Sequence, residues 1–122
     1  NTDKALKIVT QKTNSEIIDY TVAPIFMEGN SKGAHEWMIE FKTPPNDLQY
    51  FGELLDNSLK SLNSDYEAKR YNSITLNKPK IHAAQPGLFY KWMKRNNKLG
   101  GQHKVPRLSN SRQFLEALLE IN

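Results

Sequence analysis

The chain has 122 residues, of which 38% are hydrophobic and 25% are charged, and it contains no cysteine. This length fits one domain, and no apolar run approaches the roughly 20 residues that cross a bilayer, so we expect no membrane partner. The lack of cysteine excludes disulfides and thiolate sites and favours a reducing cytoplasm, in agreement with the absence of a leader pattern. The first residue is Asn1 rather than Met, which predicts that the chain has been trimmed or is a piece of a longer protein.

The positive charge is concentrated in one part of the sequence. The net charge is +4, and residues 85–115 contain no carboxylate. The cations of this basic segment are Lys91, Lys94, Arg95, Lys98, Lys104, Arg107 and Arg112. Such a segment attracts phosphate, nucleotides, nucleic acid or an acidic protein surface. A solvated basic helix face explains the same pattern, so both interpretations stay open.

The first third of the sequence predicts one helix and two strands. Apolar residues on one helical arc predict a short helix over residues 2–13. Alternating β-branched and aromatic residues predict strands over residues 17–27 and 35–42, joined by a polar loop. On the second strand Glu36 and Glu40 alternate with the apolar residues. We therefore expect both carboxylates on an exposed face, where they favour solubility rather than acid–base catalysis.

The middle of the sequence predicts two consecutive helices. Apolar residues at spacings of three and four predict a helix over residues 48–62, capped by Asn46 or Asp47. Ser64 and Glu67 then have the spacing of a capping box, in which each side chain bonds a backbone amide at the other position. This pattern predicts that a second, short helix starts at Ser64.

The last part of the sequence predicts one strand and two helices. A short strand is centred on Ile81 and Ala83, and a proline at the first helical position opens a helix over residues 86–97. Ser109 or Asn110 is expected to cap a terminal helix. The order of elements predicts the α+β class, with a small, largely antiparallel sheet covered by helices as a two-layer sandwich.

The histidines and the common catalytic motifs give little support for an independent active site. His35, His82 and His103 lie far apart in the sequence without metal-ligand spacing, so we expect no metal site. His35 and His82 are expected at a strand end or on a partly covered strand face. No nucleophile elbow, phosphate-binding loop or dinucleotide fingerprint occurs.

A glycine-led loop near the end of the basic segment is the most informative stretch. Gly100 and Gly101 allow backbone amides to approach a ligand closely. The polar or cationic side chains that follow are Gln102, His103, Lys104 and Arg107. A lysine on such a loop can act as a mobile point charge for phosphate or carboxylate. A surface turn after a helix, with Arg107 paired to a carboxylate, explains the same residues, and the pattern alone leaves both interpretations open.

Aromatic residues beside the cations raise the question of nucleic-acid binding. Phe89 and Trp92 belong to an apolar helical stripe, which leaves only Tyr90 as a base-stacking platform. The sequence contains no nucleic-acid-binding signature, so a nucleic acid is not the expected partner.

Three blocks of sequence together resemble the C-terminal domain of the Gretchen Hagen (auxin-responsive promoter) family of acyl-acid amido synthetases, in a bacterial rather than a plant form. The blocks are residues 24–41 (PIFMEGNSKGAHEWMIEF), 63–70 (NSDYEAKR) and 100–107 (GGQHKVPR), and the resemblance runs over nearly the whole chain. It implies an adenylate-forming enzyme that uses ATP and Mg²⁺ to activate an acyl acid, which an amino acid then attacks to form an amide. A large N-terminal domain would bind the nucleotide, and the C-terminal domain would move over the site as a lid.

The resemblance also implies roles for the glycine-led loop. The family's Gln-x-Lys-Val-Pro-Arg stretch falls on residues 102–107, which makes Lys104 the catalytic lysine that the lid brings to the phosphates and the reacting carboxylate. Gln102, Arg107 and the two glycines, Gly100 and Gly101, would support the loop or the phosphates. Tyrosine stands in the plant pattern at the position of His103.

The resemblance implies that residues 1–122 are a single C-terminal lid domain. Its partner would be the N-terminal adenylation domain of the same chain, and an acyl acid and an amino acid would be the substrates. The isolated domain is expected to be inactive and to bind neither ATP nor Mg²⁺ by itself. The alternative is a stand-alone basic module that binds nucleic acid or an acidic protein.

Overall fold

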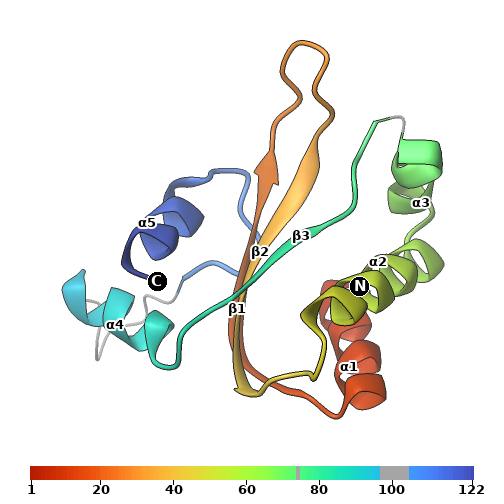
Figure 1. Cartoon of the computed structure of the whole chain (residues 1–122). Coiled ribbons are helices and arrows are strands. Elements are labelled where there is room, and N and C mark those ends of the chain that lie inside the picture. Colours follow the sequence, from red (N-terminus) through yellow and green to blue (C-terminus); the bar gives the residue numbers. More distant parts are fainter. Residues whose placement is uncertain (74, 97–104) are drawn as a thin grey trace.

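The computed structural model describes residues 1–73, 75–96 and 105–122, in which helices surround a three-stranded sheet (Figure 1). The elements are, in chain order, α1 (Thr2–Thr13), β1 (Glu16–Ile25), β2 (Ala34–Thr43), α2 (Leu48–Leu62), α3 (Ser64–Arg70), the 3-10 turn η1 (Tyr71–Ser73), β3 (Lys80–Ala83), α4 (Leu88–Arg95) and α5 (Gln113–Ile121). The strand order is β1-β2-β3; β1 is antiparallel to β2, and β3 is parallel to it. The predicted α+β class is confirmed, with a mixed sheet.

Helices cover both faces of this sheet, so the layering differs from the two layers expected (Figure 1). On one face α1, α2 and α3 enclose a core that includes Val9, Trp37, Ile39, Phe51 and Leu55. On the other face α4 and α5 enclose a second core, made by Ala23, Met38, Leu88, Phe89, Trp92, Val105, Leu115 and Leu118. The fold therefore has three layers, helix, sheet and helix, with β2 in the middle of the sheet.

The helices α4 and α5 change the exposure expected for the two glutamates of β2. Glu36 and Glu40 are each only 4% exposed. The expectation that they lie on an exposed, solubilising face is wrong, because α4 and α5 cover the face to which they point. A polar residue alternating with apolar ones is typical of a half-buried strand, but in this case both faces of the strand are buried.

Most boundaries agree with the expected ones, while the cap of α3 and the starts of α4 and α5 are different. Asp47 caps α2 by accepting a bond from the Tyr50 amide at 3.2 Å. Asn63, and not Ser64, is the N-cap of α3, since its Oδ1 accepts from two amides at 3.0 and 3.1 Å. Helix α4 starts at Leu88, after Gly87 in the left-handed region at φ 85°, rather than at Pro86.

The start of α5 also lies later than expected. The helix begins at Gln113, and the Gln113 amide donates to Ser111 Oγ at 3.1 Å. Ser109 accepts from the Ser111 amide in the preceding turn, so neither Ser109 nor Asn110 is the cap.

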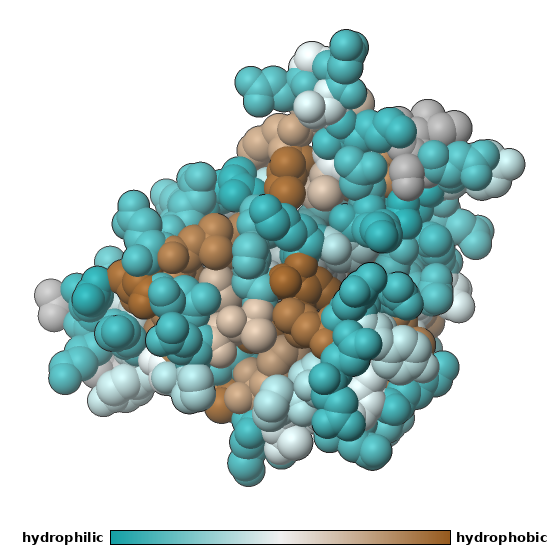
Figure 2. All heavy atoms as spheres, viewed as in Figure 1, coloured by the Kyte–Doolittle hydropathy of each residue, from teal (hydrophilic) through white to brown (hydrophobic). Residues whose placement is uncertain are grey.

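The surface is mainly polar in the view of Figure 2, where hydrophobic residues show through mostly near the centre of the face. The loop between β1 and β2 projects beyond the sheet (Figure 1) and carries Phe26 and Met27, which are 62% and 61% exposed. Among the described residues, no helix has the length and apolar character that a membrane span requires.

Candidate functional site

Most of the predicted site lies outside the described residues. Gly100, Gly101, Gln102 and Lys104 fall in the stretch that the structure leaves undescribed, as does His103, and their roles stay predictions. Arg107 is described, and so are both chain segments that lead into this stretch. The structure therefore describes Arg107 and the segments that flank the loop.

The side chain of Arg107 is engaged with the start of the chain and with β1. Its Nε lies 3.4 Å from Asp19 Oδ1 and its NH1 lies 3.8 Å from Asp3 Oδ1. The guanidinium carbon also lies 5.1 Å from the centre of the Tyr20 ring, a cation–π contact. About half of the side chain is exposed, so the contacts orient the guanidinium without enclosing it. This matches the interpretation in which Arg107 pairs with a carboxylate.

Tyr20 extends this contact into the sheet. Its hydroxyl donates to Asp3 Oδ1 at 2.6 Å, and burial together with this bond to a carboxylate raises the pKa of the tyrosine. Tyr20 therefore stays neutral and keeps donating at physiological pH.

Residues 105–109 follow the predicted loop and are fixed on the outer edge of β1. Val105 is 3% exposed and belongs to the core under α4 and α5. The Val22 amide donates to the Arg107 carbonyl at 2.8 Å, and the Ser109 amide donates to the Val22 carbonyl at 3.3 Å. The chain that leaves the loop is thus paired with the sheet like a very short parallel strand.

The segment that leads into the loop is held by a buried carboxylate. Glu40 accepts from the Gly87 amide at 2.8 Å and from the Phe89 amide at 3.1 Å. These two amides belong to the N-terminal turn of α4, where backbone N–H groups lack helical partners. A strand residue therefore caps the helix that precedes the loop, and a negative charge there is also favoured by the helix dipole.

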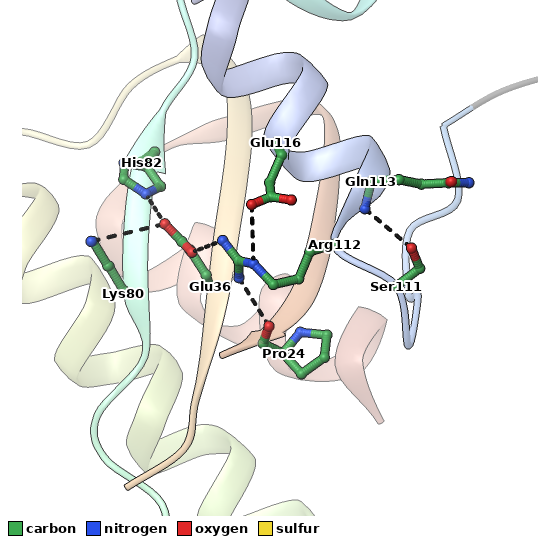
Figure 3. Close-up of polar contacts among 8 residues, drawn as sticks. All are labelled: Pro24, Glu36, Lys80, His82, Ser111, Arg112, Gln113 and Glu116. Atoms are coloured by element: carbon green, nitrogen blue, oxygen red, sulfur yellow. Dashed lines mark hydrogen bonds and ion pairs between the residues drawn. The ribbon is translucent and has the colours of Figure 1, made fainter. Parts of the chain in front are cut away.

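Figure 3 shows a second buried carboxylate, Glu36, on which side chains from β3 and from the start of α5 converge. Arg112 donates to Glu36 Oε1 and to the Pro24 carbonyl, both at 2.9 Å. His82 Nε2 lies 2.6 Å from Glu36 Oε2, and Lys80 Nζ lies 3.9 Å from the same oxygen. This Glu36 cluster ties all three strands to the start of α5.

The environment of Glu36 keeps it ionised. Burial alone would raise the pKa of the carboxyl, but hydrogen bonds from His82 and Arg112 outweigh it, and the pKa is lowered. Sequence reasoning missed this cluster, because its partners are 46 and 76 residues away along the chain. The only available signal was a carboxylate on a strand with apolar neighbours.

The basic segment is partly neutralised by these contacts. Two of its cations, Arg107 and Arg112, pair with carboxylates of the sheet and of α1. Lys91, Lys94 and Arg95 are exposed on α4, and none of them makes an ion pair within the described residues. In the part of the chain that the structure describes, the cations of this segment that make no ion pair thus all lie on α4.

A hollow of about 450 Å³ lies elsewhere, between α2 and the chain around the start of β3. One of its lining residues is Asp56, whose carboxylate accepts from the Tyr66 hydroxyl and pairs with Arg70 at 2.7 Å. These contacts outweigh burial and lower the pKa of Asp56. The hollow contains none of the predicted site residues, and its buried charge is already paired.

Within the described ranges, no group of three or more histidine and acidic side chains is arranged to hold a metal ion.

Comparison with known proteins gives one family and one fold. The model of the GH3 family C-terminal domain matches residues 1–113. The structure is similar to the AtGH3.15 acyl acid amido synthetase in complex with 2,4-DB, with a TM-score of 0.72 and 18% identity over 98% of this chain and 23% of that chain. It is also similar to a structure of the GH3.15 acyl acid amido synthetase, with a TM-score of 0.69 and 21% identity over 98% of this chain and 22% of that chain. A comparison with curated proteins finds no match.

These findings differ in what they establish. At 18% and 21% identity the two structures show a shared fold, and the chain spans less than a quarter of the length of either synthetase. The family model, in contrast, matches 113 of the 122 residues, including β1, β2, β3 and every cation of the basic segment. The chain therefore belongs to the GH3 family, as a C-terminal domain of that family.

Proposed function

We propose that this chain is the C-terminal lid domain of an ATP-dependent acyl acid amido synthetase. The match of the family's C-terminal domain over residues 1–113 carries the proposal. The similarity in fold to two structures named acyl acid amido synthetases supports it. In this reaction the acyl carboxylate attacks the α-phosphorus of ATP and pyrophosphate leaves; the amine of an amino acid then attacks the acyl carbon and AMP leaves.

Lys104 is the proposed catalytic residue of this domain. Negative charge grows on the phosphorus oxygens and on the leaving pyrophosphate in the adenylation transition state, and a positioned cation stabilises it there. Gly100 and Gly101 would let the loop approach the phosphates, and Gln102 would bind them or support the loop.

The described contacts favour a supporting role for Arg107 within this proposal. Its guanidinium already faces Asp3, Asp19 and Tyr20, with distances of 3.8 and 3.4 Å to the two carboxylates. An arginine engaged in this way fixes the chain that follows Lys104. A phosphate would have to compete with two carboxylates for it.

The remaining parts of the site are assigned to the N-terminal adenylation domain of the longer protein. That domain would bind ATP, the acyl acid and the amino acid, and would provide the ligands of Mg²⁺, which neutralises phosphate charge when bound. This domain alone would then be inactive. A cytoplasmic location agrees with the cysteine-free sequence, and the bacterial form stays a prediction.

The test uses the full-length protein and two lysine variants of the same loop region. Lys104→Ala should slow ATP–pyrophosphate exchange by about 10²- to 10³-fold, with a much smaller change in the KM for ATP, because the charge acts mainly in the transition state. Lys98→Ala is the matched control, since it removes the same charge six residues earlier. Equal exchange rates for Lys104→Ala and the parent would remove this lysine from the mechanism, and an equal, modest slowing of both variants would indicate only a general field effect.

A further inference from the structure

Thr21 is a buried polar residue in the middle of β1, and its hydroxyl forms a hydrogen bond with a segment outside the strand. Its side chain is 1% exposed, and Oγ1 donates to the carbonyl oxygen of Pro106 at 2.6 Å. Ala23, two residues further along the strand, belongs to the core under α4 and α5. Since residues two apart on a strand share a face, Thr21 points into the same layer.

Pro106 needs such a partner more than most residues do. Proline has no backbone N–H, so its carbonyl is the only backbone hydrogen-bonding group by which this residue can be fixed. Its neighbours are held by other means: Val105 is buried, and Arg107 and Ser109 pair with the backbone of Val22. The Thr21 hydroxyl therefore completes a continuous attachment of residues 105–109 to the edge of β1.

A second attachment begins where the first ends. Arg112 binds Glu36 and the Pro24 carbonyl, three residues after Ser109 (Figure 3). This contact secures the far end of the segment, while the Thr21 hydroxyl secures the end nearer to the glycine-led loop. Among the hydrogen bonds described for this segment, the bond from the Thr21 hydroxyl to Pro106 thus lies nearest in sequence to Lys104.

We propose that Thr21 is a positioning residue for the amido synthetase reaction, acting through the Pro106 carbonyl on the chain that directly follows Lys104. The inference rests on the proposed function. A catalytic charge contributes fully only when its support is fixed, and a displacement of about 1 Å can cost about 10²-fold in rate. Thr21 would act without touching substrate or nucleotide.

The test uses the full-length protein and two substitutions that separate the hydroxyl from the shape. Thr21→Val keeps the branched shape but leaves the Pro106 carbonyl without its donor, whereas Thr21→Ser keeps the donor. Thr21→Val should lower kcat for pyrophosphate exchange by about 10-fold, with the KM for ATP changed less than about twofold. Thr21→Ser should stay within about twofold of the parent.

A second readout and a control separate positioning from general stability. Amide hydrogen exchange measured by mass spectrometry should become faster in peptides covering residues 105–109 of Thr21→Val. Thr13→Val is the control, because Thr13 Oγ1 also donates to a carbonyl, that of Val9 at 2.8 Å, but on α1 across the sheet. It should leave kcat and this exchange unchanged. Should Thr21→Val fail to fold, Thr21→Ala removes the same donor without crowding the core.

Three results would overturn the inference. Unchanged kcat in Thr21→Val, together with a slow Lys104→Ala variant, would refute the role of Thr21 and leave the proposed function intact. An equal loss of kcat in Thr13→Val would show that the effect comes from general stability and not from positioning. A full-length parent without pyrophosphate exchange would refute the proposed function and this inference together.

Discussion

Replacing Glu40 should destabilise the domain far more than replacing an exposed carboxylate. Glu40 is 4% exposed and accepts from the Gly87 and Phe89 amides. Hydrogen bonds to a charged group each contribute about 1.5–3 kcal/mol, but one carboxylate serves both bonds and the helix end can fray, so we expect a total loss of about 3 kcal/mol in Glu40→Ala. In a domain of this size that corresponds to a Tm lower by roughly 10–15 °C. Glu40→Gln keeps one acceptor oxygen and should lose about half as much.

Urea denaturation of the 122-residue chain measures this directly. Trp37 and Trp92 are buried in the two separate cores, so their fluorescence reports the loss of both layers. Glu53→Ala is the matched control, because Glu53 is exposed on α2 and should change the free energy of unfolding by less than about 0.5 kcal/mol. If Glu40→Ala is no more destabilising than Glu53→Ala, the carboxylate does not cap α4 and the account of this helix is wrong.

Three further outcomes are expected. The pKa values of Glu36 and Asp56 in the folded state lie below their ordinary values of 4.5 and 3.8. The ionised carboxylates therefore stabilise the fold fully above the ordinary values, and this stabilisation is lost as the pH falls through the lower folded-state values. The free energy of unfolding measured by urea titration should accordingly decrease below about pH 4, and less steeply in Glu36→Gln. Calorimetric titration of the 122-residue chain with ATP should show a Kd weaker than about 1 mM, and micromolar binding would favour an autonomous nucleotide-binding domain. A mixed-sequence DNA duplex should bind weakly near physiological salt; submicromolar binding that is lost when Lys91, Lys94 and Arg95 are neutralised together would favour the basic binding module.

The periodic parts of the fold were accessible from the sequence. Residues 2–13 and 48–62 carry apolar side chains at helical spacing, and both helices have the expected bounds. The strand centred on Ile81 and Ala83 was also expected where β3 lies. In each case local spacing and tertiary burial favour the same structure, so the pattern alone was sufficient.

The errors arose where a distant segment decides the environment. Glu40 lies on a buried face because α4 covers it, and its partners are 47 and 49 residues further along the chain. The cap of α3 is a local exception: Asn63 and Ser64 are adjacent capping residues, and the structure uses Asn63, which bonds two amides of the helix. Spacing within the strand contains no information about the contacts of Glu40.

For the candidate site, the sequence predicted the loop but not its supports. The glycines and Lys104 were identified from residue type and from resemblance, and they lie outside the described residues. Thr21 and Glu36 lie at polar positions of the predicted strands, and both hold the chain that follows the glycine-led loop. Such residues are recognised only when the partner segment is in place.

The pairing of residues 107–109 with β1 also affects how this protein avoids self-association. An uncovered strand edge exposes unpaired amides and carbonyls that can add a strand from another molecule. In this fold the middle of the ten-residue strand β1 is capped at Val22 by its own chain, while the opposite edge belongs to the four-residue strand β3. A protein truncated after residue 104 would lose that cover together with α5, and would present both an open edge and the apolar face around Met38. Loss of residues 105–122 would thus turn a folded domain into a template for aggregation.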